Sequence, residues 1–554
     1  MKTLTILVML VLAGFESLAQ VSWQQLTQLQ SSGGNVQSRG VALDGYGGSV
    51  VTGSFRGTIC FDKLTLTSRG SEDLFVVRYG AQGRAVWAAQ FGQNSSAPSY
   101  YQASASGKAI AMDAAGNVYV LGNFTGSISY SGGTLQNYSD GFQTGLITKI
   151  NSRGQVQWAQ RFGIRQFSCY AYAIATDATG TSYITGQSDY GNIEFGNKIH
   201  SPGSRRVMYV AAYRTTGEVA WAKVSGNYST FGASGSDVAL DGRGNCYVGG
   251  FFNNDMTLDG AALTTIGTDS YLARLSTTTG ALQWLKQGGG TGTPSANNNV
   301  RIATLATDRL GNVYVAGEFS GVTSLGGHPL LGNDAGQTDL FVARYTQAGV
   351  VQWARSTGTP APEYSTQLVT DADGFSTLVG QRLNQNFEPK LLLHSFQPNG
   401  VLYTSDVVGT TGSCRGYDLA QSTSGQLYLA GTLAGTASFG PTTLQTADRT
   451  DGFVARLTIR QPTLGTRPTL EVFPNPARGR IVARLVWGDA GMRLGGKATL
   501  TNALGLQVAV QTISASPAAH LQATFDCTSL PNGLYVLQLT TSDGASYSQG
   551  VEVR

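Results

Sequence analysis

The sequence predicts an all-β protein in which a seven-bladed β-propeller, closed by its own N-terminal strand, is followed by an Ig-like β-sandwich. Three observations predict it. Tryptophans recur 63 to 71 residues apart, a strand-like segment stands alone before the first repeat, and the repeat stops at a Pro- and Gly-punctuated stretch near residue 461.

Composition agrees with a turn-rich β protein. The chain has 554 residues, too many for one ordinary core, and combines 73 glycines with a charged fraction of only 13%. Its net charge of +4 is weak, and no run of Lys or Arg is interleaved with aromatics. Nucleic acid is therefore not an expected partner.

Residues 1–19 are typical of a secretory signal peptide. They have a basic start at Lys2, an apolar stretch over 4–15, and small residues at Ser17 and Ala19. A transmembrane anchor is the alternative, but about a dozen apolar residues fall short of the roughly 20 that cross a bilayer. We expect cleavage after Ala19 and no membrane span afterwards.

Each repeat unit predicts two hairpins. One carries an apolar-Arg-Tyr strand, a turn with Gly and a strand with Trp, and the other is built on an Asp-x-x-Gly turn in which Asp accepts backbone hydrogen bonds. Examples are Val77-Arg78-Tyr79 with Gly83 and Trp87, Ala343-Arg344-Tyr345 with Gly349 and Trp353, and the turns Asp113 to Gly116 and Asp308 to Gly311. Four strands per unit match a propeller blade.

Seven units fit residues 20–460, although the sixth places Tyr403 where others have Trp. The seventh ends at 453–457 without a Gly-to-Trp strand, and the front of the chain offers such a strand at 21–26 with Trp23. Pairing the two would close the ring and remove both exposed edges. These units resemble the bacterial SBBP-type propeller repeat, which implies an architecture but no shared catalytic residues.

The period ends at a linker, residues 461–468, and short strands follow over 469–554. This segment resembles the type A C-terminal sorting domain of the type IX secretion system in Bacteroidetes-type bacteria, although Asn502 stands where Asp is usual. An ordinary accessory sandwich is the alternative. The matching residues are Pro474, Asn475, Pro476, Gly505, Leu530, Pro531, Gly533 and Tyr535. The resemblance implies the type IX machinery as partner and a secreted or outer-surface location.

No catalytic residue, metal site or cofactor is predicted. Four histidines lie in different units without ligand spacing, and five single cysteines form no C-x-x-C pair, which favours buried thiols over one disulfide. The recurring aspartates Asp73, Asp269, Asp339 and Asp451 repeat with the units, so a structural role is favoured over cation binding. Asp371 to Gly374 is more typical of a turn than of a calcium loop.

Long, variable connections between units predict the binding face, because loops on rigid scaffolds concentrate binding residues. The candidates are Tyr100, Tyr101, Phe167, Tyr170, Tyr228, Phe231, Tyr364, Arg415 and Tyr417. Capping of blade ends is an equal alternative for them. The expected function is non-enzymatic binding, adhesion or surface structure, with an extracellular polysaccharide or protein as ligand. The rival is a polysaccharide-active hydrolase or lyase.

Overall fold

The computed structural model describes residues 21–93, 103–137, 141–200, 205–226, 232–289, 299–332, 337–357, 361–447, 449–460, 469–486, 494–503, 506–516, 520–541 and 546–554. The chain divides into two compact units, Met1–Arg460 and Gln461–Arg554. The expected signal peptide and the linker 461–468 lie outside the described residues.

The prediction of an all-β chain is confirmed, since strands make up 71% of the residues that the structure describes. Within the described part of unit 1, the sheets of four or more strands number seven, and each is an antiparallel meander.

Their four core strands, in order from the inner edge outward, are as follows. Sheet 1 is β2 (Val36–Leu43), β3 (Ser49–Phe55), β6 (Asp73–Tyr79) and β7 (Ala85–Gln93); sheet 2 is β8 (Ser104–Met112), β9 (Val118–Thr125), β12 (Thr144–Ile150) and β13 (Val156–Gly163); sheet 3 is β14 (Cys169–Thr176), β15 (Ser182–Tyr190), β18 (Arg205–Tyr213) and β19 (Val219–Val224); sheet 4 is β20 (Ala233–Leu240), β21 (Asn245–Leu258), β22 (Ala261–Ser276) and β23 (Leu282–Gly288). Sheet 5 is β24 (Val300–Thr307), β25 (Val313–Ser320), β28 (Thr338–Tyr345) and β29 (Val351–Ser356); sheet 6 is β30 (Glu363–Thr370), β31 (Ser376–Leu383), β32 (Pro389–Phe396) and β33 (Leu402–Val407); sheet 7 is β34 (Gly409–Gln421), β35 (Leu427–Phe439), β37 (Asp451–Ile459) and β1 (Val21–Leu29).

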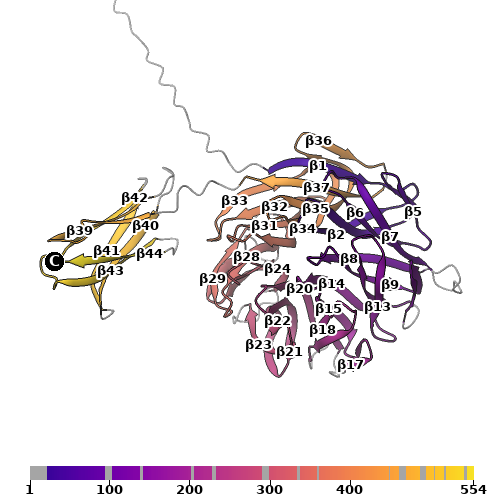
Figure 1. Ribbon diagram of the computed structural model, residues 1–554, viewed down its shortest axis with the longest axis horizontal. Helices are drawn as coiled ribbons and strands as arrows, with labels where there is room; N and C mark the ends of the chain where they lie inside the picture. The colour runs from indigo at the N-terminus through magenta and orange to yellow at the C-terminus, as the bar shows by residue number, and fades with distance from the viewer. Residues whose placement is uncertain are drawn as a thin grey trace, which may run out of the picture. The chain divides into compact units, whose positions relative to one another are not determined.

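The first strands of neighbouring sheets contact one another in chain order, and β34 of sheet 7 contacts β2 of sheet 1. In Figure 1 these first strands lie nearest the middle of unit 1, and indigo β1 lies beside orange β37. The Val41 N–H of sheet 1 also donates to Asp418 Oδ2 of sheet 7 at 2.7 Å. Two separate contacts thus join the last sheet to the first.

Strand β1 supplies the outer strand of sheet 7, as the sequence analysis expects. Its register runs from Val21 opposite Ile459 to Leu29 opposite Gly452, with a shift between Trp23 and Gln25. Because of this shift, the residue opposite Arg456 is Gln25, not Trp23.

A register shift of the same kind shows that Tyr403 of sheet 6 was wrongly aligned with the tryptophans of the other units. Thr404 lies opposite Ser395, and Leu402 lies opposite Phe396, so Tyr403 falls on the bulge between them. In sheet 1 the equivalent bulge lies between Ala85 and Trp87, and Trp87 faces Arg78. Tyr403 is therefore not the equivalent of the tryptophans, because the bulge moves it out of that position.

Short hairpins between the second and third strands tie sheets together. These are β4 (Thr58–Phe61) with β5 (Leu64–Thr67), β10 (Ser127–Tyr130) with β11 (Gly133–Gln136), β16 (Ile193–Phe195) with β17 (Lys198–His200), and β26 (Val322–Leu325) with β27 (His328–Leu331), while β36 (Thr442–Gln445) pairs with β35. Strand β10 of sheet 2 pairs with β7 of sheet 1, and β16 of sheet 3 pairs with β13 of sheet 2. The hairpins β10–β11 and β16–β17 thus extend the sheet before their own, whereas β4–β5 and β26–β27 form separate two-stranded sheets.

The recurring Trp and Gly form a contact between sheets. The indole of Trp221 donates to the Thr277 carbonyl of the next sheet at 2.8 Å, and a Cβ on Gly280 would lie 2.6 Å from the same indole. Gly280 also has a φ of +69°, which disfavours any side chain there. The same indole bond joins Trp87 to Ser152, Trp158 to Thr215, Trp284 to Gln347 and Trp353 to Pro398.

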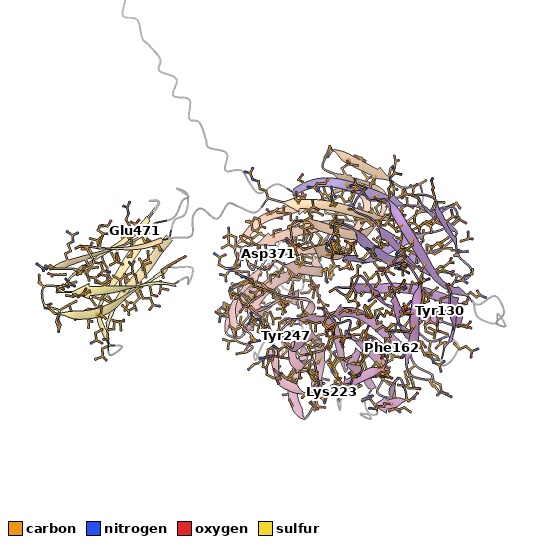
Figure 2. The ribbon with its side chains drawn as sticks, in the orientation of Figure 1. Tyr130, Phe162, Lys223, Tyr247, Asp371 and Glu471 are labelled. Atoms are coloured by element: carbon orange, nitrogen blue, oxygen red, sulfur yellow. The ribbon has the colours of Figure 1, made fainter. Side chains whose placement is uncertain are left out.

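Buried aromatic rings fill the space between sheets. Phe162 of sheet 2 packs at 5.6 Å from Tyr209 of sheet 3, ring centre to ring centre, and Tyr247 of sheet 4 is fully buried. Figure 2 shows both side chains inside unit 1. The core is therefore a succession of inter-sheet clusters.

The predicted Asp turns are confirmed. Asp113 Oδ1 accepts from the N–H of Ala115 at 3.0 Å and of Asn117 at 2.8 Å. Asp371 repeats the pattern in sheet 6. We call the edge of unit 1 with these turns, which join first to second strands, the turn face, and the opposite edge, with the inter-sheet connections, the connection face.

Unit 2 is built from two sheets that share one core. The first holds β38 (Thr469–Phe473), β39 (Arg480–Val486) and β42 (His520–Asp526); the second holds β40 (Leu494–Asn502), β41 (Gln507–Ser516), β43 (Gly533–Thr541) and β44 (Ser546–Val553). Ile481 of one sheet and Leu500 and Leu537 of the other are fully buried in this core. Among the described residues, no helix is long and apolar enough to cross a membrane.

Candidate binding site

Every inner strand of unit 1 contains a β-bulge at the same place. In β2 the register shifts between Ser38 and Gly40, so Arg39 has no residue of its own opposite it. In β8 the shift lies between Gly107 and Ala109, around Lys108. A bulge re-aims the extra side chain and is common beside functional sites.

The seven bulge residues line one cavity of about 220 Å³, which we call the axial cavity. In order around the inner strands they are Arg39, Lys108, Tyr172, Ser236, Ala303, Thr366 and Tyr417, and we call them the bulge ring. They differ in almost every sheet, although the strands around them repeat. Variation at a cavity-lining position of a repeated scaffold is typical of a ligand site.

Two cations lie side by side in the bulge ring. The Arg39 guanidinium stacks 4.0 Å from the centre of the Tyr417 ring and donates twice to Gln37 Oε1. Burial, and then the charge of Arg39, lowers the pKa of Lys108, whereas Glu72 raises it. Among the described residues neither cation forms a salt bridge.

Two carboxylates also line the axial cavity, but they accept hydrogen bonds from backbone N–H groups of the inner strands. Asp418 accepts from Val41 N at 2.7 Å and Leu419 N at 2.9 Å, and Asp237 Oδ2 accepts from Leu305 N at 2.7 Å. Burial raises the pKa of Asp237 to about 6 and that of Asp418 to about 7. Both groups link one sheet to another.

Three predicted binding residues occupy equivalent positions. Tyr170, Tyr364 and Arg415 each stand two residues before the bulge of their inner strand, toward the connection face. Tyr364 is 39% exposed. Tyr417 is itself a member of the bulge ring. The sequence analysis expected these four residues in connections between units, and this is corrected: Tyr170, Tyr364, Arg415 and Tyr417 lie on inner strands.

Phe167 lies in a different group, which we call the aromatic cluster. Its ring stacks on Tyr190 at 4.7 Å with 13° between the planes, and the ring of Phe142 lies 6.4 Å from that of Phe167. All three rings are 37–38% exposed; Phe142 and Phe167 lie in connections, and Tyr190 is the last residue of β15. Stacked, half-exposed rings offer an apolar platform with polar edges.

The remaining predicted binding residues, Tyr100, Tyr101, Tyr228 and Phe231, lie outside the described residues, as does Gly505 of the sorting segment. Among the described residues no group of three or more His, Cys, Asp or Glu is arranged to hold a metal ion. Asp73 and Asp269 serve the sheets, as expected, since they accept from Gln90 and Gln287 at 2.6 Å.

The predicted sorting residues tie the ends of unit 2 together. Asn475 Nδ2 donates to the Gly550 carbonyl, and Asn475 Oδ1 accepts from the Glu552 N–H, both at 3.0 Å. Pro474 and Pro476 flank it and follow cis peptide bonds. The Asn475 side chain thus fastens this segment to the last strand, β44.

The other sorting residues form the turn before β43. The Tyr535 hydroxyl donates to the Pro531 carbonyl at 2.7 Å, and the Leu530 N–H donates to Cys527. Gly533 is the first residue of β43. Asn502 accepts from the Leu506 N–H through its side-chain oxygen, as an aspartate could, so the departure from Asp preserves the turn.

Residues 471–551 match the family model described as a secretion system C-terminal sorting domain. The chain is therefore a protein that the type IX secretion system exports to the cell surface or the medium, and that machinery is a partner. No curated protein matches the chain.

The solved structures that match the chain are distant in sequence and have low TM-scores. A chain of the mitotic checkpoint complex is 8% identical, with a TM-score of 0.40, and the match covers 82% of this chain and 99% of that one. A protein of unknown function from Dyadobacter fermentans is 10% identical, with a TM-score of 0.37 and coverage of 79% and 99%. Drosophila semaphorin 2a is 9% identical, with a TM-score of 0.36 and coverage of 96% and 99%.

Arg39, Lys108 and Tyr172 are not among the predicted binding residues, because those were expected in the connections and these three lie on inner strands. A bulge cannot be read from a repeat aligned on its tryptophans. One signal was available: a large side chain stands between small residues in Gly107-Lys108-Ala109 and Ala171-Tyr172-Ala173. Small neighbours leave room for the bulged side chain to turn toward the axis.

Proposed function

We propose that unit 1 is a closed seven-bladed propeller of the SBBP repeat type that binds an extracellular polysaccharide after export. The pairing of β1 with β37 and the contact of β34 with β2 support closure, because they join the seventh sheet to the first. Export places the protein among polymers of the cell surface and medium, where a binding or adhesive role is available to it.

The aromatic cluster carries the proposal. Three partly exposed rings come together: Phe142 and Phe167 from two connections, and Tyr190 from the end of β15. Gln166, the neighbour of Phe167 in the chain, has a strained φ of 67°. Such strain is kept where the surrounding structure fixes it, often at ligand sites. Exposed aromatic faces stack on the C–H faces of sugars, and their edges leave room for hydroxyl groups.

The experiment compares the full exported protein with a variant in which Phe142, Phe167 and Tyr190 are all changed to Ala. Retention on a panel of insoluble polysaccharides is measured by sedimentation. We expect loss of retention at about tenfold or more, since each stacking contact contributes on the order of 1 kcal/mol. Tyr46→Ala is the matched control, because Tyr46 is 88% exposed and lies on the turn face. Unchanged retention in the triple variant, or equal loss in the control, contradicts the proposal.

A second candidate is a hydrolase or lyase centred on Asp237 and Asp418. Two cavity carboxylates with raised pKa values are the observation in its favour. Their oxygens are occupied by backbone N–H groups of neighbouring strands, which favours a structural role. Release of new reducing or unsaturated ends from the retained polysaccharide, abolished by Asp237→Asn, would establish the enzyme instead of the binding protein.

A further inference from the structure

The two sides of the bulge ring differ in the size and charge of their side chains. Tyr417, Arg39, Lys108 and Tyr172 follow one another on the adjacent inner strands of sheets 7, 1, 2 and 3. The remaining members, Ser236, Ala303 and Thr366, are all small. One wall of the axial cavity is therefore cationic and aromatic, and the other leaves space and offers two hydroxyl groups.

Within the described part of the chain, Arg39 and Lys108 have no anionic partner within bonding distance. The Arg39 guanidinium donates through Nε and Nη2 to the neutral amide of Gln37, and the Lys108 ammonium makes no hydrogen bond to any described residue. Glu72 is the acid whose charge acts on Lys108, and it accepts from Ser54. Two like charges held together without a directly bonded counter-charge cost stability, which a bound anion would recover.

The acids of the axial cavity do not supply that anion. Asp237 and Asp418 accept from backbone N–H groups on the inner strands, and neither forms a salt bridge with Arg39 or Lys108 among the described residues. Their tendency to remain protonated toward neutral pH weakens them further as counter-charges. The positive wall is consequently open to a ligand.

Size and lining narrow the ligand class. The axial cavity of about 220 Å³ is below the roughly 300–1,000 Å³ of pockets for drug-sized ligands, so it suits one sugar ring. Tyr172, 40% exposed, and Tyr417 can flank such a ring. The Ser236 hydroxyl can bond its hydroxyl groups, and the Thr366 hydroxyl, which donates to the Val379 carbonyl, can accept from one. A guanidinium beside an ammonium suits a carboxylate or a sulfate.

We propose that the axial cavity binds an acidic sugar residue, with its carboxylate or sulfate group held between Arg39 and Lys108. This inference rests on the proposed function and adds the charge of the polymer to it. The aromatic cluster would then stack on the chain, and the axial cavity would select its acidic residue.

The test uses the full exported protein and three matched sugars: galactose, galacturonate and galactose 6-sulfate. Binding is measured by calorimetry at low salt. We expect at least one acidic sugar to bind about tenfold or more tightly than galactose, and Lys108→Gln and Arg39→Gln to remove that preference. Preference for galacturonate identifies a uronate polymer, and preference for galactose 6-sulfate identifies a sulfated one.

Controls separate the site from general charge. Lys108→Arg keeps the cation and should keep the preference, whereas Lys198→Gln removes an exposed cation on β17 and should change nothing. Equal binding of all three sugars by wild type, or a preference that survives Lys108→Gln, overturns the inference. Polysaccharide retention that depends on the aromatic cluster but not on polymer charge would overturn it too, while leaving the proposed function standing.

Discussion

Asp418 shows how a single residue couples the last sheet to the first. Its carboxyl group accepts the N–H of Val41 in sheet 1 and of Leu419 in its own strand. Burial and the neighbouring charge of Asp237 raise its pKa to about 7. In the unfolded chain the same group ionises near pH 4.

This shift predicts a pH-dependent stability. Between about pH 4 and 7 the folded protein binds a proton at Asp418 that the unfolded chain has lost, so stability falls as pH rises through this range. Asp418→Asn has no such proton, and we expect it to gain stability relative to wild type by about 1–3 kcal/mol between pH 5 and pH 8. Denaturant unfolding at several pH values measures this.

Asp241→Asn is the control for this prediction. Side-chain and backbone hydrogen bonds outweigh burial and lower the pKa of Asp241, so it is ionised in both states from pH 5 to 8. Its stability difference from wild type should therefore stay constant over that range. If both variants show the same trend with pH, Asp418 does not titrate as described.

Particular residues also show what the sequence could predict. Asp113 forms a local turn, Gly280 has a positive φ, and Trp221 makes an indole bond to the next sheet. These roles recur from unit to unit, so the repeats of the sequence predict them. Lys108 and Arg39 depend on a register shift that depends on the whole sheet, and no local pattern fixes it. The turns were predictable, and the axial cavity was not.

Strand β1 differs from the outer strands of other sheets in one position that matters for packing. Gln25 faces Arg456, where Trp87, Trp158 and Trp284 stand in their sheets. A small cavity of about 30 Å³ lies beside it, lined by Gly83 among others. The contact between sheets 7 and 1 therefore lacks the indole that five other sheets provide.

Gln25→Trp is expected to raise the unfolding free energy by about 1–2 kcal/mol. The new indole would fill the small cavity and pack against Gly83, as Trp221 packs against Gly280. Thermal unfolding of unit 1 within the full chain measures the gain. Gln24→Trp serves as control, because Gln24 is an exposed bulge residue and should give none. A lower melting temperature for Gln25→Trp would mean that the site is already filled.

In unit 2 the segment around Asn475 acts as a clasp on the last strand. Its amide bonds both Gly550 and Glu552 of β44, so Asn475→Ala removes two hydrogen bonds. We expect a loss of about 1–2 kcal/mol in the stability of unit 2 and a lower extracellular yield. Gln522→Ala, an exposed amide on β42, should leave both unchanged. Normal yield from Asn475→Ala would show that export does not depend on this clasp.

At the scale of the whole molecule, the order of the seven sheets explains why binding residues gather. Inner strands meet around one axis, so one position per sheet gives a ring of seven side chains from segments spread between Arg39 and Tyr417. The repeated strands form the scaffold, and the residue type at each bulge determines which groups line the axial cavity. Connections supply Phe142 and Phe167 of the aromatic cluster, whereas the inner strands supply the two cations.

In the same arrangement, the stability of unit 1 depends on how sheets 7 and 1 meet. Deleting residues 21–29 leaves the β37 edge with unpaired backbone groups. We expect the deletion variant to melt at a lower temperature and to self-associate, because an exposed edge strand recruits another. Light scattering coupled to gel filtration, together with thermal unfolding, measures both. Removing residues 461–554 is the control: unit 1 is compact by itself, so its melting temperature should stay the same. A monomeric deletion variant with unchanged melting would show that the other sheets hold together without β1, and that the strand pair does not close the ring.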